Sequence, residues 1–304
     1  MTLDFEPKRV RLPIRFGPKT LFKFSFSGAV CSTHLTDMAE PVSLPAQQAD
    51  VVVFGSMPVS FGPKKTLSIQ HGRLYYSPKR FPRYLVDLES DYETYLNSFS
   101  SKTRSTMKRK VRKFQEAAGE REIFKEYKNP DELLDFYLTA GELSKRTYQE
   151  KVIGTGLPKG EEFKQEMLRL GAEDNVRAYT LHLDGKTVAY LYSPAKRGIL
   201  YYDFLGYDPD FAHLSPGSVL QWLAIQSIFN ERKFRIYDFE EGEGQHKQLF
   251  ATSRTECANL LVFTPTPKSI LFILLDVLLL KSTEAVLAVI RKLNARALVR
   301  RLYR

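Results

Sequence analysis

The sequence predicts an α+β protein in which mixed, mostly antiparallel sheets are flanked by helices. Aromatic residues make up 12% of the 304 residues, which favours strand-rich packing over a helical bundle. Short alternating runs broken by Gly and Pro fill residues 1–89, and helical patterns alternate with strands after that point. A chain of this length fits two modest domains better than one core.

The first part of the chain is β-rich. Its candidate strands are VRLPIRF, LFKFSFSG, DVVVFGS, TLSIQ, RLYYS and YLVDL. Ser90 and Glu93 have the spacing of a capping box and predict a short helix. A second helix is expected from about Ser101, because apolar residues recur there at helical spacing: Met107, Val111, Phe114 and Ala118.

A second half is expected from about Glu120. EIFKEYK predicts a strand, and Asn129 or Asp131 can cap the helix that follows it. GEEFKQEMLRLGA predicts another helix. Asp184 and Gly185 then supply the turn of a β-hairpin between two long strands.

Residues 198–263 form one ordered series of elements. The strand GILYYDFLGY leads through a loop into the apolar helix VLQWLAIQSIFNE, and KFRIYDF, EEGEGQHK and ECANLLVF follow. This order places the amides of a helix N-terminus beside the ends of two neighbouring strands. A phosphorylated cofactor can be held against reactive groups in such a place.

The net charge of +10 is concentrated in two segments. Residues 101–114 carry seven Lys/Arg and no acid, and residues 265–304 carry eight against two acids, so the remainder has a charge of −3. These segments suit anionic partners such as phosphates, lipid head groups or nucleic acid. For the first segment, a solvated helix joining two domains is the alternative.

The tail from Lys268 onward is helical in pattern. Its apolar run, residues 270–280, is interrupted only by Asp276 and falls short of the roughly 20 residues of a spanning helix. A core-packing helix with a basic end and an interfacial membrane helix both fit this pattern.

Cys31 and Cys257 are too few for a disulfide framework or a zinc site, and no metal is expected. The first residues lack the apolar stretch of a signal peptide, so a cytoplasmic location is expected.

Three segments carry a resemblance to a known family. SSKTRSTMKRKVRKF, LSPGS and YDFEEGEGQHKQLFAT resemble the CelD-like, exopolysaccharide-associated branch of GNAT acyltransferases, which is akin to the Fem peptidyltransferases. The resemblance implies tandem GNAT-like domains. Residues 1–119 would be a degenerate GNAT-like domain with a basic linker helix, residues 120–264 the acyltransferase domain, and residues 265–304 an amphipathic basic helix.

The LSPGS loop is the candidate cofactor site. The resemblance implies that the N–H groups of Gly217, Ser218 and Val219, with Ser215 as cap, bind the pyrophosphate of acyl-CoA (acetyl-CoA). Gly217 lets the backbone approach a ligand closely. An ordinary helix start capped by Ser215 is the alternative.

The polar cluster after the last long strand is the candidate catalytic site. Transfer to an amine needs a group that removes a proton and a donor that stabilises the oxyanion. Glu241, Glu243 or His246 can act as the base, and Lys247 can bind an acceptor phosphate or stabilise the tetrahedral intermediate. An exposed acidic loop is the alternative.

Acceptor-binding residues are expected in three places. Asp203 and Asp238 follow aromatic residues within the two strands, and Tyr202 can line an acceptor pocket. Lys108 and Arg109 of the basic helix can receive phosphate groups. Structural hydrogen bonding and packing are the alternatives for the first three residues.

The leading hypothesis is an acyl-CoA-dependent N-acyltransferase without a covalent enzyme intermediate. Its acceptor would be an amino sugar, or a glycan or lipid-linked precursor of exopolysaccharide or envelope synthesis. One alternative is a Fem-like transferase that uses aminoacyl-tRNA. Of the hypotheses considered, it alone involves a nucleic-acid partner. Another is a non-catalytic, membrane-associated assembly factor. The basic tail would place the protein at the inner membrane face.

Overall fold

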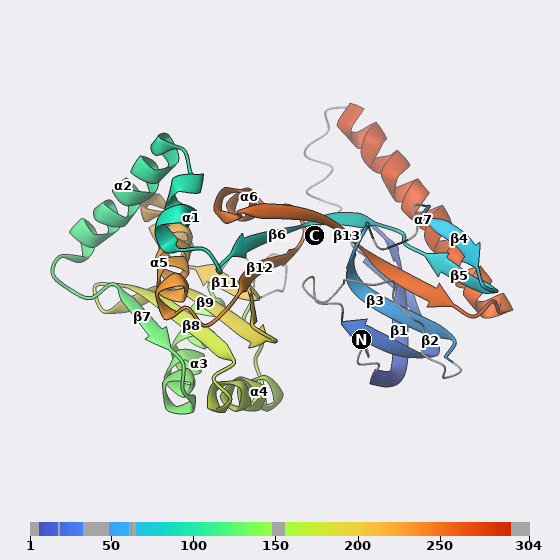
Figure 1. Cartoon of the computed structure of the whole chain (residues 1–304), viewed down its shortest axis with the longest axis horizontal. Coiled ribbons are helices and arrows are strands. Elements are labelled where there is room, and N and C mark those ends of the chain that lie inside the picture. Colours follow the sequence, from blue (N-terminus) through green and yellow to red (C-terminus); the bar gives the residue numbers. More distant parts are fainter. Residues whose placement is uncertain are drawn as a thin grey trace. The chain divides into compact units, whose positions relative to one another are not determined.

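The computed structural model describes residues 6–17, 19–32, 49–60, 62, 65–147 and 156–292. The chain forms two compact units (Figure 1). Unit 1 comprises Met1–Pro82 and Thr255–Arg304, and unit 2 comprises Arg83–Arg254. These limits differ from the expected boundaries after residues 119 and 264, because the basic helix packs within unit 2 and the last long strand lies mostly in unit 1.

Unit 2 contains a mixed, mostly antiparallel sheet, as predicted. Its strands, in spatial order, are β6 (Arg80–Asp87), β12 (Ile236–Glu241), β10 (Ile199–Tyr201), β9 (Lys186–Lys196), β8 (Val176–Leu183) and β7 (Phe124–Tyr127). β11 (Phe204–Tyr207) also pairs with β9. β10 and β12 are parallel, whereas the other pairs in this unit are antiparallel.

The β8–β9 hairpin turns at Asp184 and Gly185, as predicted. Both residues have a positive φ, 51° and 74° respectively, which a tight two-residue hairpin turn requires. Gly185 adopts this conformation without steric cost, and Asp tolerates it better than most residues. The turn fixes the register of the two longest strands of the unit.

Helices cover both faces of this sheet (Figure 1). One face carries α1 (Tyr92–Ser98), α2 (Ser101–Ala118), α5 (Pro216–Glu231) and α6 (Gln245–Phe250). The other face carries α3 (Pro130–Ser144) and α4 (Glu161–Ala172). Strand residues alternate between the two cores: Tyr179 and Leu191 face the first, while Tyr190 and Tyr192 face the second.

The helix starts follow local capping chemistry. Asn129 caps α3 in a complete capping box with Glu132. The predicted Ser90–Glu93 box is wrong by one position, because Asp91 accepts the N–H of Thr94 at 2.6 Å. The negative charge of an Asp at this position also interacts favourably with the positive end of the helix dipole.

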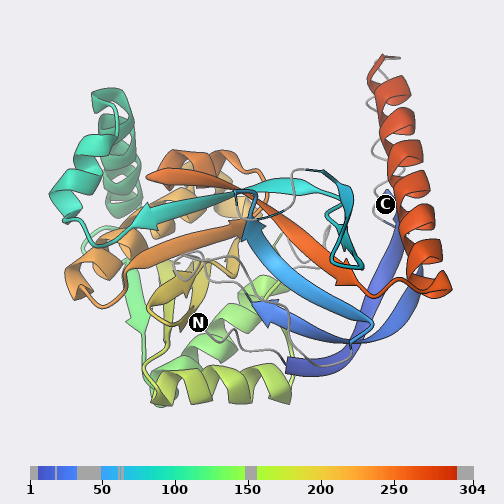
Figure 2. The same ribbon diagram turned by 45° about the vertical axis from the view of Figure 1, so that its right-hand side comes forward.

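Unit 1 contains its own group of strands, and the described part of the unit has one helix packed on them. Its strands lie in the order β1 (Glu6–Phe16), β2 (Lys19–Ser32), β3 (Val51–Pro58), β13 (Ser253–Phe263), β5 (Arg73–Tyr76) and β4 (Leu67–Gln70). The helix α7 (Pro267–Lys292) packs on β1 and β2, as Figure 2 shows. Phe24, Phe26 and Phe272 form its aromatic contact with the sheet. Across the described ranges, no helix has both the length and the apolar character needed to cross a bilayer.

Candidate functional site

The sheet of unit 2 divides where β10 and β12 stop pairing. Tyr201 lies opposite Asp238, and the N–H of Tyr202 donates to the Asp238 carbonyl at 2.9 Å. Beyond this bond, β11 follows β9 and β12 follows β6. We call the place where they part the fork, bounded by Tyr202–Asp203 and Phe239–Glu241. The sequence suggested one continuous strand from Gly198 to Tyr207, but the chain forms two strands there.

A buried ion pair fixes one side of the fork. Asp238 is 1% exposed and binds Arg83 through both oxygens, at 3.1 Å from Nε and 2.7 Å from Nη2. The same carboxylate accepts the N–H of Glu240 at 2.8 Å. The register between β12 and β6 shifts here, and Glu240 has a φ of 58°. Asp238 therefore stabilises a β-bulge that sets the positions of the residues after it.

Asp203 and Glu240 are the unusual carboxylates of the fork. Desolvation, followed by repulsion from Glu240, raises the pKa of Asp203 to about 7. Desolvation is also the first cause that raises the pKa of Glu240. Both residues are nevertheless exposed at the surface of the unit, where a ligand can reach them. A carboxyl group with a pKa near 7 can accept a proton at neutral pH.

His246 and Lys247 come to the fork from α6. The His246 ring lies 5.7 Å from the Tyr202 ring, and desolvation, with Lys247 nearby, lowers the pKa of His246. Lys247 Nζ donates to the Glu241 carbonyl at 2.8 Å. Desolvation lowers the pKa of Lys247, although Glu240 and Asp238 act against this shift. The polar segment expected as a loop thus contains a short helix that brings both side chains to the fork.

Glu241 and Glu243 differ from the carboxylates of the fork. Glu243 accepts hydrogen bonds from Tyr84 at 2.9 Å and Gln248 at 2.8 Å. These bonds, with Arg254 nearby, lower the pKa of Glu243. Glu241 contributes its carbonyl to Lys247, and its side chain is exposed. The bonding of Glu243 therefore suits a structural contact better than proton transfer.

The α5 N-terminus lies at the same sheet edge as the fork. β10 and β11 both run antiparallel to β9, and β12 runs parallel to β10. The helix that connects β11 to β12 must therefore begin at the edge where β12 ends. This is the edge that carries Glu240 and Glu241.

Two of the three backbone N–H groups expected to bind a cofactor at this helix start already donate hydrogen bonds within the protein. Ser218 and Val219 both donate their N–H to the Ser215 carbonyl, at 3.0 and 3.1 Å. Ser215 has a left-handed conformation, and its side chain makes no cap hydrogen bond. Gly217 packs closely against β11, since an added Cβ would lie 3.3 Å from both Leu205 and Tyr207. Of the three proposed amides, the one at Gly217 alone has no partner in the described part of the chain.

The basic residues of α2 do not form a single patch. Lys113 Nζ donates to the His213 carbonyl at 3.3 Å, so this side of α2 faces η2 (Pro209–Leu214), the short 3-10 helix before α5. Arg109 lies one turn before Lys113 on the same side. Lys108 is turned away from Arg109 by roughly 100°. The two residues expected to act together are both exposed but point in different directions.

The structure adds Arg83 and Glu240 to the predicted site residues. Arg83 is a charged residue within the otherwise apolar run FPRYLV, which is a signal for a buried ion pair. The conformation of Glu240 depends on a bulge that has no local sequence signature. In the described ranges, no three His, Cys, Asp or Glu side chains are placed to hold a metal ion.

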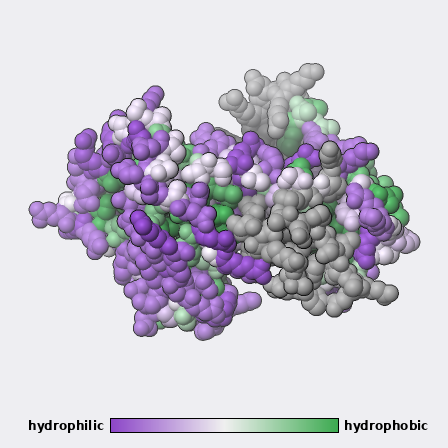
Figure 3. All heavy atoms as spheres, in the orientation of Figure 1, coloured by the Kyte–Doolittle hydropathy of each residue, from purple (hydrophilic) through white to green (hydrophobic). Residues whose placement is uncertain are grey.

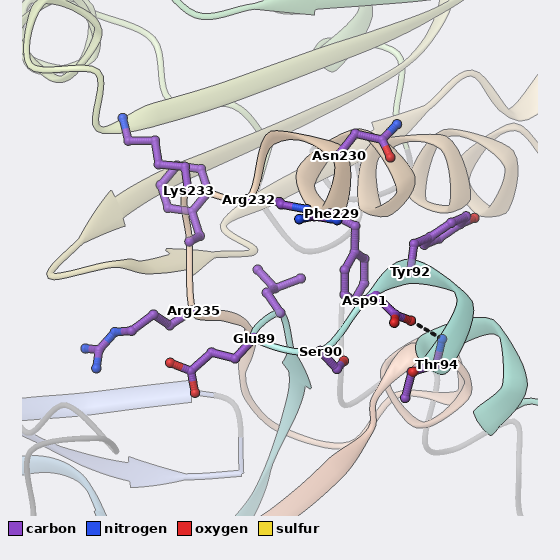
Figure 4. Close-up of a pocket in the computed structure, with 12 residues that line it drawn as sticks. Glu89, Ser90, Asp91, Tyr92, Thr94, Phe229, Asn230, Arg232, Lys233 and Arg235 are labelled. Carbon is purple, nitrogen blue, oxygen red and sulfur yellow. Dashed lines mark hydrogen bonds between the residues drawn. The ribbon is translucent and has the colours of Figure 1, made fainter.

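A depression in unit 2 lies elsewhere. It has a volume of about 900 Å³ and lies beside the C-terminus of α5 and the start of α1 (Figure 4). Arg232, Arg235, Glu89 and Asp91 are among the residues that line it. β12 begins at this edge and ends at the fork, so the depression lies at the opposite end of the strand. Its charges are mixed, and Asp91 is already used as the cap of α1.

Comparisons with known proteins concern both the family and the fold. Residues 101–248 match the family model described as "Acetyltransferase (GNAT) domain". The crystal structure of FemX is similar with a TM-score of 0.53 and 11% identity, and the alignment covers 89% of this chain and 90% of that one. L-PGS from Bacillus licheniformis has a TM-score of 0.46 and 10% identity over 84% and 85% of the two chains. A search of curated proteins found no match.

A third structure contains a ligand. It is the PaiA N-acetyltransferase of Thermoplasma acidophilum in complex with coenzyme A, with a TM-score of 0.27, 11% identity, and coverage of 37% of this chain and 76% of that one. At these identities the likeness concerns the fold, and of these three structures FemX has a TM-score above 0.5. The fold is GNAT-like, and the match to the GNAT acetyltransferase domain lies within unit 2, which contains the fork.

Proposed function

We propose that the protein transfers an acyl group from acyl-CoA to an amine of an amino sugar or of a glycan or lipid-linked precursor. The observation that carries this proposal is the fork, where Asp203 with a pKa near 7 lies at the same sheet edge as the start of α5. The match to the GNAT domain supports transferase chemistry at this place. The acceptor class rests on the resemblance to the exopolysaccharide-associated branch.

Asp203 is the proposed general base. An amine must lose a proton as it attacks the thioester carbonyl, and a base with a pKa close to the working pH performs this step best. Desolvation, and after it repulsion from Glu240, keeps the proton affinity of Asp203 high. His246, whose pKa is lowered, is neutral at pH 7 and is the second group able to accept the proton.

Lys247 is the proposed partner of the leaving group. As the new C–N bond forms, the C–S bond breaks and a thiolate is released. A lysine ammonium with a lowered pKa gives up its proton more readily than a free one, and it is also a positive charge near the developing negative charge. Asp238 and Arg83 act as positioning residues, because they hold the bulge that carries Glu240.

The phosphates of the donor would lie between α5 and α2. The Gly217 amide can donate at the helix start, where the helix dipole favours negative charge. Because the Ser218 and Val219 amides are occupied, side chains must supply most of the charge. Arg109 lies on the side of α2 that faces η2 and is suitably placed for this role.

A Fem-like transferase that uses aminoacyl-tRNA is the second candidate. Two observations favour it: the likeness to FemX extends over 89% of the chain, and α2 exposes several cations. RNA phosphates would then replace the phosphates of CoA along α2. In this case the amine acceptor and the role of Asp203 remain the same.

A single-turnover assay with labelled donors separates these candidates. Radiolabelled acetyl-CoA is mixed with excess enzyme and amino-sugar acceptors, and charged tRNA is tested in parallel. Label transfer from acetyl-CoA, together with micromolar binding by calorimetry, supports the first proposal. Transfer only from charged tRNA supports the second. Binding of neither donor would overturn both and favour a non-catalytic role.

A further inference from the structure

We propose that α7 lies in the interface of an anionic phospholipid membrane. This inference is independent of the proposed function, because it concerns unit 1 alone. α7 carries an exposed line of residues spaced by three or four, here called the apolar stripe: Leu271, Leu274, Leu278, Ser282, Ala285 and Val289. Spacing of this kind puts residues on one side of a helix.

The apolar stripe is unusually exposed for residues of this type. Leu274 is 63% exposed, Leu278 is 61% exposed and Val289 is 56% exposed. The polar member, Ser282, donates its hydroxyl to the Leu278 carbonyl at 2.8 Å, so its hydrogen bond is made within the helix. At 1.5 Å per residue the stripe is roughly 27 Å long. Hydrophobic surface is visible on the described part of α7 in Figure 3.

The opposite side of α7 already has a partner. Phe272 and Ile273 are buried against the sheet of unit 1, and Tyr76 donates to Asp276 at 2.7 Å. The helix is therefore apolar on two sides, and only one of them is covered. A helix that is apolar all round is normally buried, so the exposed side calls for a second partner.

Charge identifies that partner as an anionic surface. Unit 1 carries 19 Lys/Arg against 8 Asp/Glu, a net charge of +11, whereas unit 2 carries 26 against 27. The whole positive charge of the protein thus belongs to the unit with the exposed helix. A second copy of the chain would bring two such charges together, which opposes self-association. Anionic lipid head groups neutralise the charge while acyl chains receive the leucines.

Local charges fit the same arrangement. Lys281 is exposed and lies beside the apolar stripe, where its ammonium can reach head groups. The β1–β2 strands also expose Arg9, Arg11 and Lys23, which alternate with the residues packed on α7 and so lie on the other face of the sheet, where they add only long-range positive charge. Asp276, the acid in the apolar run, is on the covered side. The helix would therefore lie along the membrane plane, with its second side still on the sheet of unit 1.

Vesicle sedimentation with matched variants tests the proposal. The full-length protein is mixed with vesicles of phosphatidylcholine alone and with vesicles that also contain phosphatidylglycerol. Leu274→Glu and Leu138→Glu form a matched pair, since both leucines are 63% exposed and Leu138 lies in unit 2. Because both sites are exposed, both variants should fold, which a thermal melt verifies.

We expect the wild type and Leu138→Glu to bind anionic vesicles equally. Leu274→Glu should weaken this binding at least tenfold, which is about the effect of losing one buried leucine side chain. Binding should fall with added salt and be weak on neutral vesicles. In a second measurement, Leu271→Trp should bind normally, and lipids with brominated acyl chains should quench its fluorescence.

Three results would overturn the proposal. One is equal vesicle binding by Leu274→Glu and Leu138→Glu, which would mean that the basic surface acts without the apolar stripe. Another is no binding of the wild type to anionic vesicles. The third is a stable dimer in analytical ultracentrifugation that Leu274→Glu dissociates, because a second copy would then be the partner of the stripe.

Discussion

The two units use the same kind of sheet for different purposes. Unit 2 covers both faces of its sheet with helices, has almost no net charge, and brings its polar residues together where two strands part. Unit 1 carries the positive charge and has one described helix, whose outer side remains exposed. The nearly neutral unit thus holds the polar cluster of the fork, and the charged unit holds the exposed side of a helix.

Each unit also contains a carboxylate shielded from solvent, Asp238 fully and Asp276 in part, and the two have different partners. In unit 2, Asp238 is paired with Arg83, and in unit 1, Asp276 accepts from Tyr76. Desolvation raises the pKa of both acids, and the partner opposes the shift in each case. The charged pair holds the bulge at the fork, whereas the neutral partner anchors α7. Variants at these places can therefore test whether the units act separately.

The largest effect is expected at Asp203. Asp203→Asn should lower turnover by about 10² to 10⁴, the range typical of losing a general base. In the wild type, the rate should rise as the pH passes through about 7, because the base acts only when deprotonated. The variant should lose this step in the pH–rate profile. Vesicle binding by unit 1 should be unchanged.

A control variant tests whether the loss of turnover is specific to Asp203. Asp135→Asn removes an exposed carboxylate on α3, on the other face of the sheet, and should leave turnover near normal. The folded protein holds the Asp203 proton more tightly than the unfolded chain does. Ionisation of Asp203 therefore lowers the free energy of unfolding as pH rises from about 4 to 7. Asp203→Asn should therefore melt at a higher temperature than the wild type at pH 8. An unchanged pH profile would remove Asp203 from the mechanism.

Arg83→Met should give the largest loss of stability. It leaves Asp238 buried without its partner, which typically costs about 3–5 kcal/mol. Trp222 is the only tryptophan and is buried in unit 2, so its fluorescence during urea unfolding follows this unit. The double variant with Asp238→Asn should regain most of the loss, since the amide still accepts the Glu240 N–H. A single variant as stable as the wild type would contradict this account.

Tyr76→Phe should destabilise unit 1 by about 1–3 kcal/mol. The change removes the hydroxyl that donates to Asp276 and leaves a half-buried acceptor unpaired. Circular dichroism should show earlier melting, while the unfolding followed by Trp222 should stay the same. If both signals shift together, the two units unfold as one and the comparison between them fails.

The smallest effect is expected on α2. Arg109→Ala should weaken donor binding about two- to fivefold at low salt, because an exposed charge contributes little once solvent screens it. Lys108→Ala is the matched control, since it removes the same charge from a side of α2 turned away from Lys113. Calorimetry with acetyl-CoA measures both variants. Equal weakening would mean that α2 acts through its overall charge only.

Elements with strong local signals could be predicted from the sequence. Asp184 and Gly185 specify their hairpin, because both residues tolerate the positive φ that the turn requires. Asn129 and Glu132 specify the start of α3, because together they form its capping box. The apolar helix α5 follows from its composition, although it starts at Pro216, three residues before the expected apolar run.

The geometry of the fork could not be predicted, because it depends on partners far along the chain. The segment from Gly198 to Tyr207 has the composition of one strand, yet the division into β10 and β11 depends on where β12 stops pairing with it. Arg83 and Asp238 are 155 residues apart, so nothing local links them. Asp203 was expected to bind the acceptor, and its raised pKa comes first from desolvation in the folded unit and then from the neighbouring Glu240.

The discontinuous chain of unit 1 has a consequence for biosynthesis. β3 of this unit pairs with β13, and the whole of unit 2 lies between them in the sequence. On the ribosome, Arg83–Arg254 can therefore fold while the first strands still wait for their partner. During that interval β3 has an open edge, which is a site for incorrect pairing with other chains. Nascent unit 1 therefore exposes an unpaired strand until the chain has been synthesised as far as β13.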